Sequence, residues 1–127
     1  MKEQIKEYFI KLKKTIGNLN LDEITDAVNA VRAAYERGAV IYIFGNGGSA
    51  ATASHFVGDF NKGISEEKHK KFNLVCLNDN LPMLTAIAND IGYGEIYRFP
   101  LKGRLKKEDL VIAISGSGNS ENVINAV

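Results

Sequence analysis

The spacing of apolar residues predicts two amphipathic helices at the start of the chain. Within residues 3–16 the apolar side chains recur every three or four positions, as on one face of an α-helix: Ile5, Phe9, Leu12 and Ile16. Residues 21–37 repeat the pattern, and Gly38 follows as a typical C-terminal stop. Both apolar faces must be covered, so we expect these helices to pack on a sheet or on another subunit.

Three continuous runs of apolar, β-branched and aromatic residues predict strands that are buried on both faces. These runs cover 39–44, 72–77 and 110–114. Helical patterns separate and follow them, at about 50–61, at 82–90, through Ile96, Tyr97 and Leu101, and from about 121 onward. This alternation is typical of an α/β fold with a parallel sheet, in which ligands bind beyond the carboxyl ends of strands.

The composition is that of an ordinary globular protein and indicates one domain over residues 1–127, with helices in 1–37 and the sheet and its loops in 38–127. A net charge of +1 gives no electrostatic reason to expect a nucleic-acid partner, since such proteins gather Lys and Arg against phosphates. No apolar run reaches 18 residues, so no membrane partner is expected. The charged N-terminus and the single Cys76 favour the reducing cytoplasm.

A glycine-rich loop follows the first predicted strand and contains the candidate ligand-binding residues Asn46, Gly47, Gly48 and Ser49. It fits the loose dinucleotide pattern G-x-G-x-x-G/A, but that pattern requires an acidic residue about 20 positions later, at the end of the second strand. That strand instead ends at Asn78-Asp79, so the fingerprint is only half met. No Lys follows the glycines, which excludes a Walker A loop. We therefore expect no nucleotide cofactor; the alternative interpretation of the loop is a tight strand-to-helix turn.

A second loop, rich in serine and glycine, follows the third predicted strand and precedes a helix. Its candidate phosphate-binding residues are Ser115, Gly116, Ser117, Asn119 and Ser120. Free N–H groups at a helix N-terminus favour an anion, and serine hydroxyls add hydrogen-bond donors. The alternative is a serine N-cap combined with a turn.

The helix after the first loop is predicted to present a polar stripe. Ser49, Thr52, His55 and Asp59 lie three or four positions apart and therefore share one face. His55 and Asp59 form an i,i+4 pair that is close enough to share a metal ion or a substrate. The alternative is a solvent-facing pair without a ligand.

Four motifs, taken in order, resemble the sugar isomerase (SIS) domain superfamily and, within it, the phosphoheptose isomerases. They are the loop 45–50, His55-Phe56, the segment 84–90 and the loop 115–120. The resemblance covers nearly the whole chain. It implies a three-layer α/β/α domain of flavodoxin- or Rossmann-like type, and a homotetramer formed through the N-terminal helices.

The resemblance also implies roles for particular residues. The loop with Ser115, Ser117 and Ser120 would hold the phosphate of a sugar phosphate, with 45–49 lining the same pocket. Asn89 and Asp90 match an Asn-Asp motif whose carboxylate contacts sugar hydroxyls.

In phosphoheptose isomerases the helix after the first loop carries a His and, four residues later, a Glu that is the proposed catalytic base; both can bind zinc. His55 matches this His, whereas Asp59 stands at the position of the Glu and Gly116 where Thr is common. Asp59 keeps the carboxylate on a side chain one methylene shorter, so the reach of the base is the property that changes.

The activity implied is an aldose–ketose isomerisation between sedoheptulose 7-phosphate and D-glycero-D-manno-heptose 7-phosphate, with Asp59 and His55 as catalytic residues. The alternative is a non-catalytic SIS module that binds a phosphosugar or a protein such as a replication initiator. The SIS fold has about five strands, and its late catalytic Gln and His would lie beyond Val127, so we expect the chain to be C-terminally incomplete.

Overall fold

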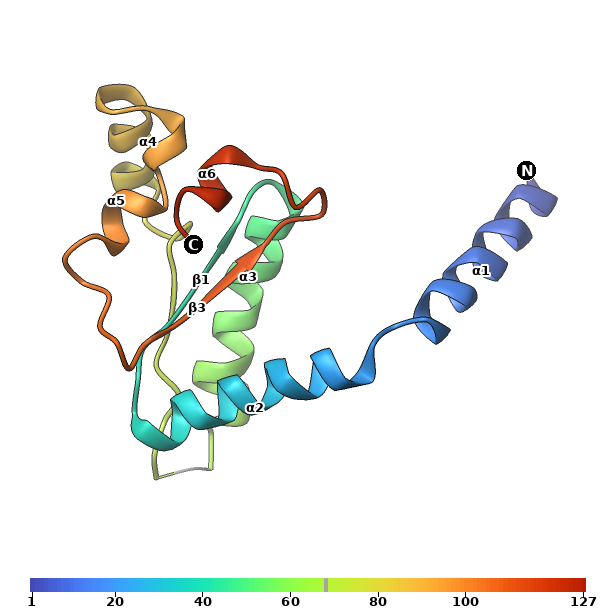
Figure 1. Cartoon of the computed structure of the whole chain (residues 1–127), viewed down its shortest axis with the longest axis horizontal. Coiled ribbons are helices and arrows are strands. Elements are labelled where there is room, and N and C mark those ends of the chain that lie inside the picture. The colour runs from blue at the N-terminus through green and yellow to red at the C-terminus, as the bar shows by residue number, and fades with distance from the viewer. Residues whose placement is uncertain (68) are drawn as a thin grey trace. The chain divides into compact units, whose positions relative to one another are not determined.

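The computed structural model describes residues 1–67 and 69–127 and contains six α-helices, two short helices of other types and three strands (Figure 1). In chain order the elements are α1 (Lys2–Gly17), α2 (Leu21–Arg37), β1 (Ile41–Gly45), α3 (Gly48–Gly58), the π-helix η1 (Asp59–Ile64), β2 (Leu74–Cys76), α4 (Leu81–Asp90), the 3₁₀-helix η2 (Tyr93–Glu95), α5 (Arg98–Leu101), β3 (Leu110–Ile114) and α6 (Glu121–Ile124). The chain divides into two compact units, Met1–Ala30 and Val31–Val127. Among the residues described, no helix is long and apolar enough to cross a membrane.

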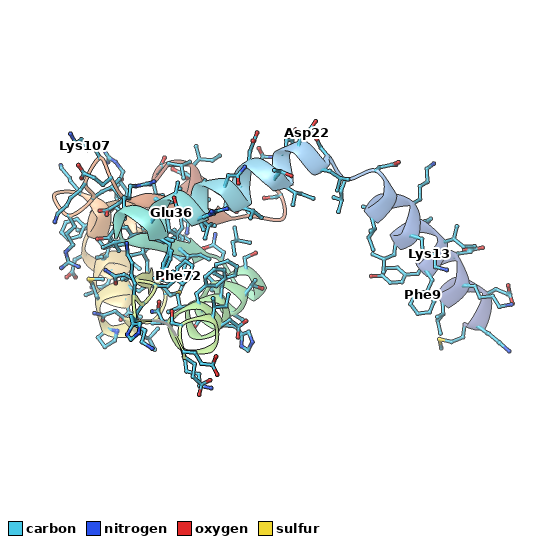
Figure 2. The ribbon with its side chains drawn as sticks, turned by 90° about the horizontal axis from the view of Figure 1, so that it is seen from below. Phe9, Lys13, Asp22, Glu36, Phe72 and Lys107 are labelled. Carbon is cyan, nitrogen blue, oxygen red and sulfur yellow. The ribbon has the colours of Figure 1, made fainter. Side chains whose placement is uncertain are left out.

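The first unit contains α1 and the beginning of α2, and its apolar stripe is exposed. No residue of α1 is buried, and the side chain of Phe9 is 54% exposed (Figure 2). Asn20 caps α2, because its Oδ1 accepts from the Asp22 N–H at 3.0 Å and its Nδ2 donates to Glu23 Oε1 at 3.0 Å. The sequence prediction of two amphipathic helices is thus confirmed. The apolar residues of α1 and of the beginning of α2, such as Ile24 and Val28, are exposed, whereas Ala34 near the end of α2 is buried.

The second unit is built on a parallel three-stranded sheet of order β2-β1-β3, which confirms the predicted α/β class. The central strand β1 pairs Ile41 with Leu74 on one side and with Leu110 on the other. All five residues of β3 are only half-buried, so the prediction of a fully buried third strand is wrong. Strand β3 is an outer strand of the described sheet, whereas β1 is covered from both sides.

The outer edge of β2 is closed by one side chain. Strand β1 forms its hydrogen bonds with the residues next to Leu74, as in the bond from Ile41 N–H to Asn73 O. The N–H and C=O of Leu74 therefore point away from β1. The amide of Asn61, which lies in η1, accepts from the Leu74 N–H and donates to the Leu74 carbonyl, both at 2.9 Å. The helix predicted over 50–61 therefore ends at Gly58 and continues as a π-helix that positions Asn61.

Helices cover both faces of the sheet, in agreement with the predicted three layers. One face packs on α3, where Ala53 is fully buried beside Ile43 and Cys76. Phe56 stacks on Phe60 in the same layer, and Phe60 meets Phe72 edge to face.

The other face carries a core formed by α4, η2, α5 and α6. Its buried members are Phe44, Leu77, Ile87, Ile96, Tyr97, Leu101 and Val123. Phe44 of β1 and Tyr97 stack at 4.5 Å between ring centroids, which fixes Tyr97 beneath the carboxyl end of β1.

Candidate functional site

The two predicted loops leave the carboxyl ends of adjacent strands, and a glycine lets them meet. A Cβ on Gly45 would lie 2.7 Å from the Ile114 carbonyl oxygen and 2.7 Å from the Ser49 Cβ, closer than real Cβ contacts allow. The absence of a side chain therefore brings the end of β3 against the first loop. Gly47 follows with a φ of +54°, a conformation that favours glycine.

Three hydroxyl groups converge in the second loop. Ser115 Oγ lies 3.5 Å from both Ser117 Oγ and Ser120 Oγ, and it accepts from the Gly118 N–H at 3.0 Å. Ser120 precedes α6 but its side chain makes no capping hydrogen bond. The alternative of a serine N-cap is thus not what the structure contains, and the Ser120 hydroxyl is left facing its serine neighbours.

Backbone N–H groups in both loops are available to an anion. In the part of the chain that the structure describes, the N–H groups of Gly47, Gly116 and Ser117 have no hydrogen-bond acceptor within the protein. Such groups bind phosphate oxygens without a Lys or Arg. Donors from two loops at one edge of the sheet are an arrangement suited to binding a phosphate ester.

Asn46 connects the first loop to the helix that follows the second. Its Nδ2 donates to Asn122 Oδ1 at 2.8 Å, and Asn122 Nδ2 donates back to Asn46 Oδ1 at 2.9 Å. Asn46 Oδ1 also accepts from the Tyr97 hydroxyl at 2.8 Å and from the Tyr93 hydroxyl at 3.2 Å. Sequence reasoning selected Asn46 but not these three partners.

The Tyr97 hydroxyl is the buried centre of this arrangement. It lies 2.5 Å from the Gly45 carbonyl oxygen and accepts from Asn78 Nδ2 at 3.0 Å. The Asn78 side chain in turn pairs with both the N–H and the C=O of Gly45. Burial raises the pKa of Tyr97 above its ordinary value of 10.0, so the hydroxyl keeps its proton near neutral pH.

One signal could have identified Asn78 in the sequence. It directly follows the second predicted strand, and polar residues at that position face the same sheet edge as both loops. Tyr97 and Asn122 carry no such signal, because the apolar pattern around each predicts only a helix.

His55 in α3 and Asp59, the first residue of η1, lie together on an exposed side of this helical segment, as the predicted polar stripe requires. His55 Nε2 is 3.5 Å from Asp59 Oδ1, and the two side chains are 82% and 61% exposed. They line a shallow pocket with Ala51, Thr52 and Phe56. The carboxylate is therefore held near the imidazole while it remains accessible to a substrate.

This pair alone does not make a complete zinc site. A catalytic zinc ion usually takes three protein ligands, and among residues 1–67 and 69–127 no group of three His, Cys, Asp or Glu side chains is placed to hold a metal. A zinc ion on His55 and Asp59 would need further ligands from outside these residues.

Asn89 and Asp90 lie at the end of α4, where both are exposed. Asn89 Nδ2 donates to Asp90 Oδ1 at 2.8 Å. The structure shows no hydrogen bond from either side chain to the two loops, so their contact with a sugar stays a prediction.

The chain matches the family model described as "SIS domain" over residues 6–127. It is 36% identical to the phosphoheptose isomerase of Thermodesulfovibrio yellowstonii over 95% of this chain and 60% of that protein. It is 37% identical to the phosphoheptose isomerase of Helicobacter pylori over 91% of this chain and 59% of that protein.

Two solved structures are similar to it. The phosphoheptose isomerase from Neisseria gonorrhoeae gives a TM-score of 0.84 at 29% identity, and one from Francisella tularensis gives 0.87 at 26%. Each match covers 98% of this chain and 66% of the other. The chain therefore spans less than two thirds of the length of each of these four proteins.

Proposed function

The chain belongs to the SIS domain family. From that premise we propose that it acts as a phosphosugar isomerase, which interconverts sedoheptulose 7-phosphate and D-glycero-D-manno-heptose 7-phosphate. The similarity to proteins named phosphoheptose isomerase supports this substrate. The observation that carries the proposal is the meeting of two donor-rich loops at Gly45 and Ile114. The accessible carboxylate of Asp59 lies at the opposite end of α3 from the first loop and supplies the candidate base.

The phosphate group binds at the second loop. The hydroxyls of Ser115, Ser117 and Ser120 and the free N–H groups of the loop donate to its oxygens, and Gly47 and Gly48 allow the first loop to approach from the other side. Gly48 has open space around its Cα, since a Cβ there would meet no atom within 4 Å. Anchoring this remote group orients the carbons that react.

Isomerisation moves a proton between adjacent carbons through an enediolate, which requires a base and a group that stabilises the developing oxyanion. Asp59 abstracts the proton, and His55, 3.5 Å away, donates to the sugar oxygens. Asn89 and Asp90 bind sugar hydroxyls. A divalent ion such as zinc, if it binds His55 and Asp59, would polarise the same oxygens.

The functional form is a homo-oligomer, for which we propose a tetramer. The exposed apolar stripes of α1 and α2 supply the surface that such an assembly would cover, including Phe9 at 54% and Val28 at 61% exposure. The buried free thiol of Cys76 suits the cytoplasm, where thiols stay reduced.

The test is the exchange of a carbon-bound proton of sedoheptulose 7-phosphate in heavy water, followed by NMR. We expect exchange with the wild-type chain, and a loss of at least 10²-fold in Asp59→Asn with binding of the sugar phosphate retained. Asp26→Asn, which neutralises an exposed carboxylate on α2, is the matched control. Binding without exchange in the wild-type chain would refute the isomerase and favour a phosphosugar-binding module.

A further inference from the structure

Asn122 is a buried polar side chain to which the proposed chemistry assigns no role. It lies in α6 and is 3% exposed, yet its amide is fully directed at Asn46, which lies 76 positions earlier in the chain. The two amides form a reciprocal pair at 2.8 and 2.9 Å, in which each donates to the other. Such a pair fixes both position and orientation, because it needs both planar groups to face each other.

Tyr97 determines which way the Asn46 amide is turned. A hydroxyl has one proton, and the Tyr97 oxygen receives a donor from Asn78, so its proton is shared between the Gly45 carbonyl and Asn46 Oδ1. This places the Asn46 oxygen toward Tyr97 and the nitrogen toward Asn122. At 1% exposure, Tyr97 cannot move away without opening the core beside Phe44.

The pair lies where the two loops would otherwise separate. The close contact of Gly45 with Ile114 fixes only the base of the first loop. Gly47 and Gly48, which follow, have no atoms that a Cβ would touch. The hydrogen bonds that their carbonyls accept come from α3, so these bonds hold them to α3 and not to the second loop. Asn46 is the intervening residue, and Asn122 holds it to the helix into which the second loop leads.

We propose that Asn122 is a positioning residue: with Tyr97 it ties Asn46, and thereby the first loop, to the second loop, so that both loops bind one phosphate group as a unit. The inference rests on the proposed function for its ligand, a phosphate ester. Asn122 itself touches only protein. Its effect reaches the phosphate through the backbone N–H groups of the first loop.

The competing interpretation is that Asn46 acts alone as a direct ligand. The two interpretations predict different mutational patterns. If the pair acts as a unit, Asn46→Ala and Asn122→Ala each weaken phosphate binding by about tenfold, and the double variant is no worse than either single one. If Asn46 binds phosphate directly, Asn46→Ala costs much more than Asn122→Ala and the two losses add.

The experiment is a titration of the full chain with inorganic phosphate, followed by two-dimensional amide NMR. In the wild-type chain we expect the signals of both 46–49 and 115–120 to shift with one dissociation constant. In Asn122→Ala phosphate should bind more weakly, and only the signals of 115–120 should follow this binding. The signals of 46–49 should no longer shift with the same dissociation constant. The matched control is Asn125→Ala, on the same helix, whose Nδ2 donates to the Gly94 carbonyl at 3.2 Å. If the signals of both loops still shift with one dissociation constant in Asn122→Ala, the inference is overturned. The proposal that the chain binds phosphate would not be affected by this result.

A second readout separates this inference from the proposed function. Amide hydrogen exchange of Gly47–Ser49 is measured without phosphate in the wild-type, Asn122→Ala and Asn125→Ala chains. Faster exchange at these amides in Asn122→Ala alone supports the tie between the loops, even where phosphate binds to none of the chains. Exchange equal in the two variants overturns it.

Discussion

Gly45 is the residue at which the structure makes its sharpest prediction, because a single methyl group should be intolerable there. Replacement by Ala would place the Cβ 2.7 Å from the Ile114 carbonyl oxygen and 2.7 Å from the Ser49 Cβ, whereas ordinary contacts begin at 3.4 Å. Neither neighbour is the end of a flexible side chain. The end of β3 or the start of α3 must therefore move by several tenths of an ångström, at a cost of about 2–3 kcal/mol.

Gly48 provides the matched control three residues later. A Cβ there meets no atom within 4 Å, and Gly48 is the first residue of α3. Because alanine loses less conformational entropy than glycine in a helix, Gly48→Ala should stabilise the fold by up to about 1 kcal/mol. The two variants should differ by about 3 kcal/mol, or about 10 °C in melting temperature for a chain of this size.

The assay is urea unfolding and thermal melting, both followed by circular dichroism. Each variant receives the same single methyl group, so the comparison isolates the space around the glycine. A Gly45→Ala chain as stable as the wild type would show that the close approach of β1, β3 and α3 is not required. Equal destabilisation in Gly48→Ala would show that any methyl in this loop is harmful, which would refute the contact argument.

Four further outcomes are expected. Asp59→Asn should lose proton exchange by at least 10²-fold with phosphate affinity unchanged; equal exchange would remove Asp59 from the chemistry. Burial raises the pKa of Tyr97, so the folded state holds this proton more tightly than the unfolded one, and stability should fall as pH rises past 10. Tyr97→Phe should show a shallower fall, measured as the urea midpoint between pH 8 and 11; parallel curves would contradict this. Burial also raises the pKa of the Cys76 thiol, so it should react with a thiol reagent at pH 8 only after unfolding. Phe9→Glu should lower the mass in size-exclusion chromatography with light scattering, whereas an unchanged mass would remove α1 from the assembly.

Periodicity predicted the large elements well because each carries an apolar run or stripe along its length. The strand 110–114 and the helix 21–37 have the predicted bounds, since the apolar run or stripe in each continues for its full length. The π-helix at Asp59–Ile64 was not predicted. Its i→i+5 hydrogen bonding coincides with the hydrogen bonds of Asn61 with Leu74, a contact across 13 positions that no local pattern records.

The candidate site also contains residues that the sequence could predict and residues that it could not. The loop glycines and serines are recognisable because local conformation and donor chemistry demand those residue types in a short segment. The residues that join the loops are Asn78, Tyr97 and Asn122, which lie far apart in the sequence and meet only in the folded chain. Each is chosen by its partners in space, so its residue type alone says nothing about its role.

Asn61 also makes the two outer edges of the described sheet different. With its amide on the outward N–H and C=O of Leu74, it serves β2 as a neighbouring strand one residue long. A strand from another molecule would have to displace both bonds before it could add at that edge. Among residues 1–67 and 69–127, no side-chain amide forms a matching pair of hydrogen bonds with the outer edge of β3. Any further strand, from this protein or from another molecule, should therefore pair with the described sheet at β3 and not at β2.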